Sequence, residues 1–303
     1  MTRRFGFRLA TEGSWRDFLD FPLVALAIAV ALFIGASEIG QALASLISLP
    51  TQAGQTWLTN ALVLGVILTT YKVAIVRLGA FPRDDLTYSG AVVNVGAGIL
   101  IGFLLMAASV GIAAISHVYH LLGEGDSSEL IHELVTTGVM TAFTEEIVFR
   151  GILFRWLEEL GGTWVALIMS SALFGMAHVF NANATWFASL AVAIEGGFLL
   201  GGAYMLTRNL WLPIGIHAAW NVTQGEVFGV PVSGGPVHGL VRARLAGPPL
   251  LSGGGFGLEA SLIALVIAAA VGACFVWLAI RRGEIVRPAW VRGSEPADEL
   301  GQS

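Results

Sequence analysis

Three long stretches of the sequence carry almost no formal charge. Residues 21–71 contain a single charged side chain, Glu38, and residues 91–123 and 160–194 contain no Asp, Glu, Lys or Arg. A helix of about 20 predominantly apolar residues crosses the roughly 30 Å hydrocarbon core of a bilayer and satisfies its own backbone hydrogen bonds there. These stretches therefore predict membrane-spanning helices.

The composition excludes a soluble enzyme. Only 12% of the 303 residues are charged, against about 25% in an average soluble domain, and the mean hydropathy is +0.76. The lone cysteine, Cys274, excludes an internal disulfide framework, and a net charge of −5 gives no basic footprint for nucleic acid. We predict an all-α fold, a polytopic membrane helix bundle with about eight transmembrane helices. They are placed at approximately residues 21–49, 56–76, 91–117, 130–157, 164–181, 184–206, 211–228 and 258–280.

The cations of the connecting segments predict the orientation, because short cytoplasmic loops are enriched in Lys and Arg. With eight spans, the cations of both termini and of the second and sixth connections fall on one side of the membrane. The exception is residues 229–257, which carry Arg242 and Arg244 and are rich in Gly and Pro, a pattern typical of a structured or re-entrant loop. We expect an integral, multi-pass protein of the bacterial inner membrane with both termini cytoplasmic.

The central part of the fourth predicted span, residues 144–150, contains three charged residues. An ionisable side chain at the membrane centre costs about 2.5 to 3.5 kcal/mol, so each one needs a partner or a function. At about 100° per residue, Arg150 lies about 40° from Glu146 and about 140° from Glu145 around the helix. Glu146 and Arg150 are therefore expected to pair, and Glu145 is expected to remain available.

Two further spans carry polar groups. The fifth contains His178, and the seventh contains His217 and Asn221 at positions i and i+4, on one helical face. Such groups often hydrogen-bond one span to the next. Two adjacent glutamates with only one matched cation favour a buried functional site instead.

The ordered set of these residues resembles a known family. The patterns are Glu145-Glu146-x-x-x-Arg150, Phe174-x-x-x-His178 and His217-x-x-x-Asn221. They resemble the three motifs of the CAAX-protease and bacteriocin-processing (CPBP) intramembrane peptidases, which include the type II CAAX prenyl endopeptidases. The resemblance implies an intramembrane endopeptidase and covers residues 145–221, whereas the first three spans match only in being hydrophobic.

Peptide hydrolysis needs an activated water, donors for the oxyanion and an acid for the leaving amine. We expect Glu145 and His178 to hold and deprotonate the water, a pairing that the resemblance supports. Glu146, in its ion pair, is expected to fix the local charge and the helix face. His217 and Asn221 are expected to donate to the oxyanion, which is also the role that the resemblance implies.

Two arrangements of these residues remain open at this level. Glu145 or Glu146, together with His178 and His217, offers three ligands and an open position, which suits a catalytic divalent metal such as zinc. A metal-free glutamate mechanism uses the same residues, and the donor pair on one helical face favours it. The sequence therefore does not decide between a metal-free site and a site that holds a divalent metal such as zinc.

Signatures of other intramembrane proteases fail. His132-Glu133 lacks the second histidine of the H-E-x-x-H zinc motif, and the G-x-G-D string ending at Asp126 has no partner aspartate inside a span. The competing functions are a proton-coupled transporter, in which the buried groups relay protons, and a non-catalytic membrane assembly or immunity protein. The sequence shows no internal repeat of the kind that many transporters have.

We expect residues 1–20 to form a cytoplasmic N-terminal segment and residues 285–303 a polar tail. Residues 21–284 are expected to form the transmembrane peptidase domain, with the motifs in 141–225. The expected partners are the lipid bilayer and a membrane-associated peptide or protein substrate. A composition rich in Ala, Gly, Leu and Val is typical of a bacterial protein, and a bacterial cell is not expected to offer a prenylated substrate.

Two other acids lie inside predicted spans without a nearby cation in the sequence. Glu38 and Glu195 are expected to be protonated or paired with a hydroxyl or amide. Glu195 precedes Gly196 and Gly197, where helices can pack closely. A position for Glu195 beside the active cavity is a further expectation.

Overall fold

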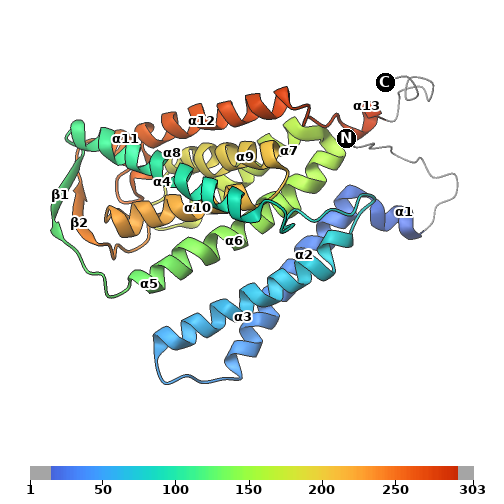
Figure 1. Ribbon diagram of the computed structural model, residues 1–303, viewed down its shortest axis with the longest axis horizontal. Coiled ribbons are helices and arrows are strands. Elements are labelled where there is room, and N and C mark those ends of the chain that lie inside the picture. Colours follow the sequence, from blue (N-terminus) through green and yellow to red (C-terminus); the bar gives the residue numbers. More distant parts are fainter. Residues whose placement is uncertain (1–14, 293–303) are drawn as a thin grey trace.

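A computed structural model describes residues 15–292 and confirms the predicted helical membrane bundle (Figure 1). The first part of the chain forms α1 (Trp15–Asp20), α2 (Pro22–Ser45), α3 (Gln52–Val73), η1 (Ile75–Arg77), α4 (Ala91–Ile115) and β1 (Tyr119–Glu124). The middle forms α5 (Leu130–Glu133), η2 (Leu134–Met140), α6 (Thr141–Glu146), η3 (Ile147–Phe154), α7 (Arg155–Ala177) and η4 (His178–Phe180). The last part forms α8 (Trp186–Val192), η5 (Ala193–Leu199), α9 (Leu200–Thr207), α10 (Trp211–Val222), η6 (Thr223–Val227), β2 (Val241–Leu245), α11 (Pro249–Ser252), η7 (Leu258–Ala260), α12 (Leu262–Arg281) and α13 (Ala289–Arg292).

Several long helices begin where the sequence offers a hydroxyl cap. Thr51 before α3, Thr185 before α8 and Ser261 before α12 each accept a hydrogen bond from the backbone N–H three residues later. These bonds satisfy one of the N–H groups that the first turn of a helix leaves unpaired. The apolar runs that follow are then long enough to continue as spans.

Six helices in the described part of the chain are long and apolar enough to cross a membrane. The fourth of them, Leu130–Phe180, accounts for two of the predicted passes, because the backbone breaks at Gly162 with φ 78° and ψ 173°. A side chain at Gly162 would also meet the carbonyl oxygen of Val286 at 2.8 Å. The seventh predicted pass corresponds to α10 and η6, which together are shorter than the about 20 residues of a usual span.

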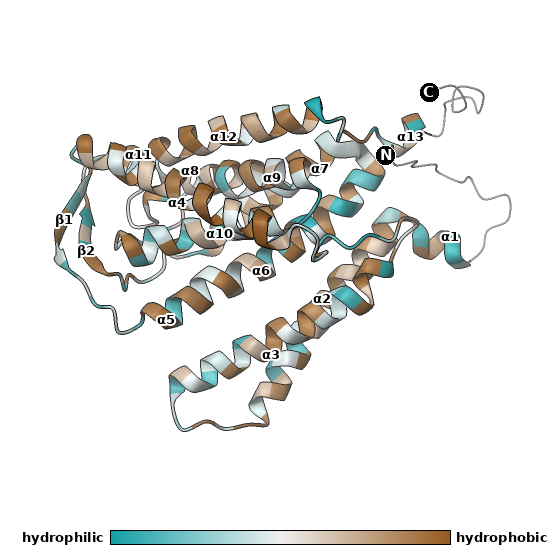
Figure 2. Ribbon diagram, in the orientation of Figure 1, coloured by the Kyte–Doolittle hydropathy of each residue, from teal (hydrophilic) through white to brown (hydrophobic). Residues whose placement is uncertain are grey.

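The α2–α3 hairpin projects away from the other helices (Figure 1). Only 22% and 17% of the most hydrophobic windows of these two spans are buried, and their surfaces are apolar on most sides (Figure 2). The two helices pack closely at Gly40, where an added Cβ would lie 2.5 Å from the Cα of Val63. Much of the hairpin is therefore suited to contact lipid.

One strand pair interrupts the helical pattern. β1 and β2 are antiparallel, with Tyr119 opposite Leu245 and Glu124 opposite Val241. The sequence predicts an all-α fold, so this sheet was missed. The expectation that residues 229–257 are structured is confirmed by β2 and α11.

The strand pair lies at one end of the bundle, whereas α1 and α13 lie at the other (Figure 1). The described ends of the chain therefore share a side, as the eight-span topology requires. That this side is cytoplasmic stays a prediction. The outermost parts of the predicted N-terminal segment and polar tail, residues 1–14 and 293–303, lie outside the described residues.

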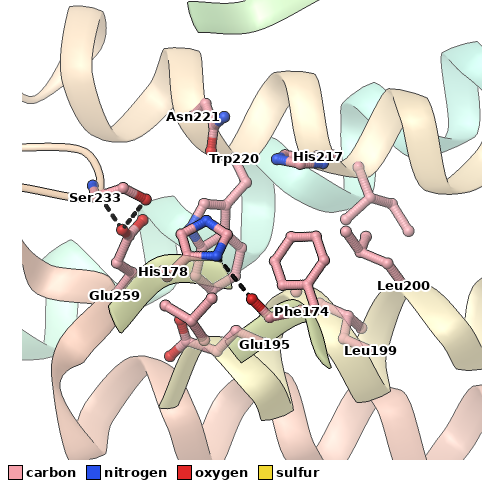
Figure 3. A pocket seen from close by; sticks show the side chains of 13 residues that line it. Phe174, His178, Glu195, Leu199, Leu200, His217, Trp220, Asn221, Ser233 and Glu259 are labelled. Carbon is pink, nitrogen blue, oxygen red and sulfur yellow. Dashed lines mark hydrogen bonds between the residues drawn. The ribbon is translucent and has the colours of Figure 1, made fainter. Parts of the chain in front are cut away.

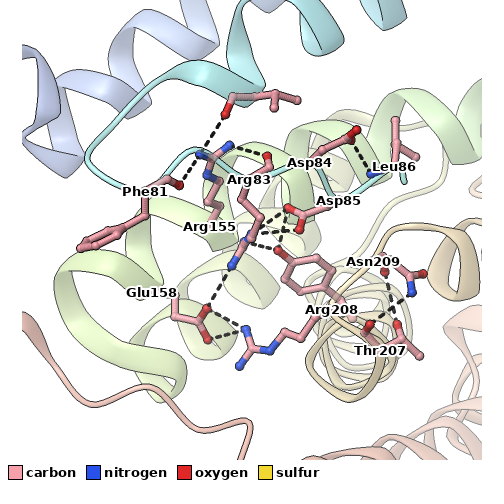
Figure 4. A network of polar contacts seen from close by, with 12 residues as sticks. Phe81, Arg83, Asp84, Asp85, Leu86, Arg155, Glu158, Thr207, Arg208 and Asn209 are labelled. Carbon is pink, nitrogen blue, oxygen red and sulfur yellow. Dashed lines mark hydrogen bonds and ion pairs between the residues drawn. The ribbon is translucent and has the colours of Figure 1, made fainter. Parts of the chain in front are cut away.

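A buried polar network joins the loop after η1 to the ends of α7 and α9 (Figure 4). Arg83 contacts Asp85 at 2.9 Å, and Arg208 contacts Glu158 at 2.7 Å. Tyr204 donates to Asp85 at 3.1 Å. Burial by itself lowers the pKa of Arg83, but Asp85 and its other partners raise it above its ordinary value. Loop cations that predict the topology from sequence thus also hold the helix ends together.

Candidate active site

The motif residues come from three helices that meet inside the bundle. Glu145 and Glu146 end α6, and His217 lies in α10. His178 follows α7 and shares a cavity with His217 and Asn221 (Figure 3). The structure therefore brings the three predicted motifs to one place.

Glu146 is the centre of a buried hydrogen-bond cluster. Its Oε1 atom lies 2.7 Å from Arg150 Nη1 and 2.9 Å from His217 Nδ1. The side chains of Glu146 and Arg150 are 0% and 1% exposed. The ion pair that the helical spacing predicts is present, and it extends to a histidine 71 residues away.

Arg150 connects this cluster to a neighbouring helix. Its Nη2 atom donates to the carbonyl oxygens of Gly196 and of Gly197, the latter at 3.0 Å. An added Cβ at Gly197 would lie 2.5 Å from the Cα of Ser171. The expectation that helices pack closely at Gly196 and Gly197 is therefore confirmed, and the close approach lets the guanidinium reach the η5 backbone.

Glu145 is oriented differently from its neighbour. Its carboxyl group forms no hydrogen bond to any residue of the described chain, and its Oε2 atom lies 3.8 Å from Nε2 of His217. The side chain is 28% exposed, whereas that of Glu146 is fully buried. Glu145 is thus the available carboxylate of the pair, in the position that the helical spacing predicts.

The hydrogen bonds of the two histidines indicate their tautomers. Nδ1 of His178 lies 2.8 Å from the carbonyl oxygen of Phe174, which only accepts, so this nitrogen carries the hydrogen. The Nε2 atom of neutral His178 is therefore an acceptor. Nδ1 of His217 faces the carboxylate of Glu146 and carries a hydrogen for the same reason.

Phe174 links the polar groups, a role that sequence reasoning did not assign. Its ring stacks on His178 with a centroid distance of 4.9 Å and lies 6.1 Å from the ring of His217. The guanidinium of Arg150 lies 5.1 Å from the same ring centroid. The phenylalanine of the second motif therefore holds the histidine rings and screens the ion pair from the cavity.

Asn221 is tied to the helix that precedes the glutamates. Its Nδ2 atom donates to the carbonyl oxygen of Thr137 at 3.1 Å. Since an amide nitrogen carries two hydrogens, one N–H remains for another acceptor. The side chain lines the cavity together with His217 (Figure 3).

The cavity also contains acidic groups from outside the three motifs. Glu195 and Glu259 line it, as does Ser233, which donates to Glu259 through its backbone N–H at 2.6 Å and its hydroxyl at 2.8 Å. The expected position of Glu195 beside the motif residues is confirmed. Glu259 was missed, because it lies 38 residues after the last motif, and the only signal was an acid at the start of the last predicted span.

The helices around the site contain irregular turns. The π-helical segments η2 and η3 flank the two glutamates, η5 contains Glu195, and η6 follows directly after α10. Turns of this kind occur frequently at functional sites, because they redirect side chains that a regular helix would place elsewhere. A uniform helical spacing cannot predict them.

The predicted metal ligands lie near one another but do not form a metal-binding group. Among residues 15–292, no three His, Cys, Asp or Glu side chains come together as a group that could hold a metal ion. His178 bonds to a backbone carbonyl, and the carboxylate of Glu146 is occupied by Arg150 and His217. Glu145, His178 and His217 therefore do not fit the zinc arrangement.

The chain is similar to one family model and to one known protein. Residues 127–223, which contain all three motifs, match the family model described as Type II CAAX prenyl endopeptidase Rce1-like. A protein of Bacillus subtilis (strain 168) named "Putative membrane peptidase YdiL" is 26% identical over 198 residues, which cover 61% of this chain and 76% of that protein. No solved structure matches the chain. Residues 127–223 of the helical membrane bundle are therefore similar to the Rce1-like type II CAAX prenyl endopeptidases, in the region where the three motifs predict such a similarity.

Proposed function

We propose that this protein is an intramembrane endopeptidase that hydrolyses a peptide bond of a membrane-associated protein or peptide, in the inner membrane of a bacterium. One observation carries the proposal. The carboxylate of Glu146 binds both Arg150 and His217, so the second nitrogen of His217 faces an unbonded carboxylate, that of Glu145. Helix packing alone does not need a free acid at this place.

The first step is attack by water. Glu145 accepts a proton from a water molecule, and the Nε2 atom of His178 accepts a hydrogen bond from the same water and orients it. The water oxygen then forms a bond to the scissile carbonyl carbon, and the carbonyl oxygen becomes an oxyanion. General base catalysis of this kind contributes about 10² to 10⁴ in rate.

The oxyanion needs N–H donors that are already in place. The remaining N–H of Asn221 is one, and the Nε2–H of protonated His217 is the other, with the charge of this ring balanced by Glu145 and Glu146. The C–N bond then breaks, and the proton held by Glu145 passes to the leaving amine. Arg150 contributes by keeping Glu146, and through it His217, in position.

The test is cleavage of quenched-fluorescent membrane-anchored peptides by the full-length protein in vesicles. Glu145→Ala and His178→Ala are expected to abolish cleavage while the protein stays folded by size-exclusion chromatography. Glu38→Gln is the matched control, because this acid lies in α2 and is exposed on the bundle surface. Unchanged cleavage in both site variants overturns the proposal.

The same vesicles separate the peptidase from the competing transporter. A proton or solute flux that Glu145→Ala and His178→Ala both abolish, in the absence of any cleavage, would assign the buried groups to a relay. Cleavage without flux supports the peptidase. The comparison uses one preparation, so differences in folding affect both measurements equally.

A further inference from the structure

The proposed mechanism leaves one wall of the cavity without a role. Glu195, from η5, and Glu259, from η7, lie on the other side of His178 from His217 (Figure 3). Glu195 is 5% exposed and Glu259 is 4% exposed. Two carboxyl groups are thus buried against the space in which the proposed hydrolysis takes place.

Neither carboxyl group has a lysine or arginine partner among residues 15–292, and the bases that interact electrostatically with Glu259 are the two histidines of the cavity, His178 and His217. Glu195 forms no hydrogen bond and no ion pair there, and its Oε1 atom is fully buried. Glu259 accepts only from Ser233 and has no Lys or Arg beside it. Arg150 is committed to Glu146 and to the carbonyl groups of η5. Burying a carboxyl group without a partner is costly, so an unpartnered one facing a cavity indicates a ligand.

The chemistry of the cavity defines the ligand. Carboxylate oxygens only accept hydrogen bonds, and their complement is an ammonium or guanidinium group that brings several N–H donors. Apolar side chains, among them Leu199, Leu200 and Trp220, line the same cavity. A cavity lined by both apolar side chains and acids suits a side chain with an aliphatic stem and a cationic tip.

We propose that Glu195 and Glu259 form a subsite for a lysine or arginine side chain next to the scissile bond of the substrate. The subsite rests on the proposed peptidase function, because the substrate brings the cation. It also explains why Glu195 stays buried and unpaired in the free protein. The free-energy cost of burying the unpaired carboxyl group is offset when the cationic side chain binds.

Cleavage preference tests the subsite directly. The full-length protein in vesicles is given membrane-anchored peptides that are identical except for Lys, Arg, Gln or Glu at one position, scanned on both sides of the cleaved bond. At one position, kcat/KM is expected to be about 10- to 100-fold higher for Lys or Arg than for Gln. The separate Lys and Arg peptides show which cation the cavity prefers.

The acids are then replaced singly. Glu195→Gln and Glu259→Gln are expected to remove the preference, so that Lys, Arg and Gln peptides are cleaved at similar rates. Glu38→Gln, an acid far from the cavity, is expected to keep it. Equal cleavage of the Lys, Arg and Gln peptides by the unaltered protein overturns the subsite, and so does a preference that both cavity variants retain.

A binding measurement separates this inference from the peptidase assignment. n-Hexylamine, a cation on an aliphatic stem, is expected to raise the melting temperature of Glu145→Ala protein, and 1-hexanol is expected not to. The shift is expected to disappear in Glu145→Ala/Glu195→Gln. If no peptide is cleaved but this shift is found, the peptidase function fails and the cation subsite stands. If peptides are cleaved but neither the charge preference nor the shift is found, the subsite fails and the peptidase stands.

Discussion

Removing one charge of the buried Glu146–Arg150 pair should destabilise the protein more than removing both. Arg150→Met deletes the 2.7 Å contact to Glu146 and the bonds to two carbonyl groups of η5. The fully buried carboxylate then keeps only His217 as a partner. Breaking a buried pair from one side costs about 3–5 kcal/mol.

The double variant Glu146→Leu/Arg150→Met removes the pair altogether. Replacing a buried ion pair by apolar side chains is often close to neutral, and the main remaining cost is the lost acceptor of His217 Nδ1, about 1–3 kcal/mol. We therefore expect the double variant to be more stable than Arg150→Met. Both variants are expected to lose cleavage, Arg150→Met because Glu146 is no longer fixed by the guanidinium, and the double variant because His217 loses its bond to Glu146. The double variant should therefore regain stability relative to Arg150→Met without regaining cleavage.

The assay is unfolding in mixed micelles by increasing SDS, followed by tryptophan fluorescence, with cleavage measured in parallel. Lys72→Met is the matched control, because the Lys72–Asp84 pair is about one third exposed and exposed pairs contribute only about 0–1 kcal/mol. Exposed ion pairs contribute at most about 1 kcal/mol. If the free energy of unfolding of Arg150→Met lies within about 1 kcal/mol of that of Lys72→Met, the reasoning is refuted. A double variant less stable than Arg150→Met would refute it as well.

Four other substitutions test other parts of the structure. Gly196→Ala places a Cβ 2.1 Å from a ring carbon of Phe174, so we expect a loss of about 1–3 kcal/mol in SDS unfolding and a lower kcat. Gly65→Ala meets nothing within 4 Å and should gain about 0.5–1 kcal/mol; equal behaviour of the two would contradict the packing argument. Glu158→Gln removes the carboxylate that contacts Arg208 at 2.7 Å, while Arg208 keeps its contact to Glu284, and should cost about 1–3 kcal/mol. The kcat of the folded protein should be unchanged, and a loss of kcat would contradict this expectation. Asn221→Ala should lower kcat by about 10² to 10³, and a normal kcat would exclude it as an oxyanion donor.

The sequence alone was sufficient to predict those features that depend on interactions between residues close together in the chain. Charge-free runs of about 20 residues predict spans, because a bilayer requires helices of that length. The Glu146–Arg150 pair follows from the same reasoning, since residues four apart on a helix are neighbours. The polar residues inside the spans indicate the site, because an ionisable group in the membrane is costly unless it is paired or used.

Only the tertiary structure decided which groups meet across the bundle. Phe174 lies between two histidines, β1 pairs with a segment more than 100 residues away, and Glu259 enters the cavity from a Gly-rich connection. These contacts depend on how whole helices pack and on irregular turns such as η3 and η5, and no short-range periodicity records them. The sequence thus determined that the protein spans a membrane and which charges are out of place there, and packing determined that Glu145 faces His217 while Glu195 faces the cavity unpaired.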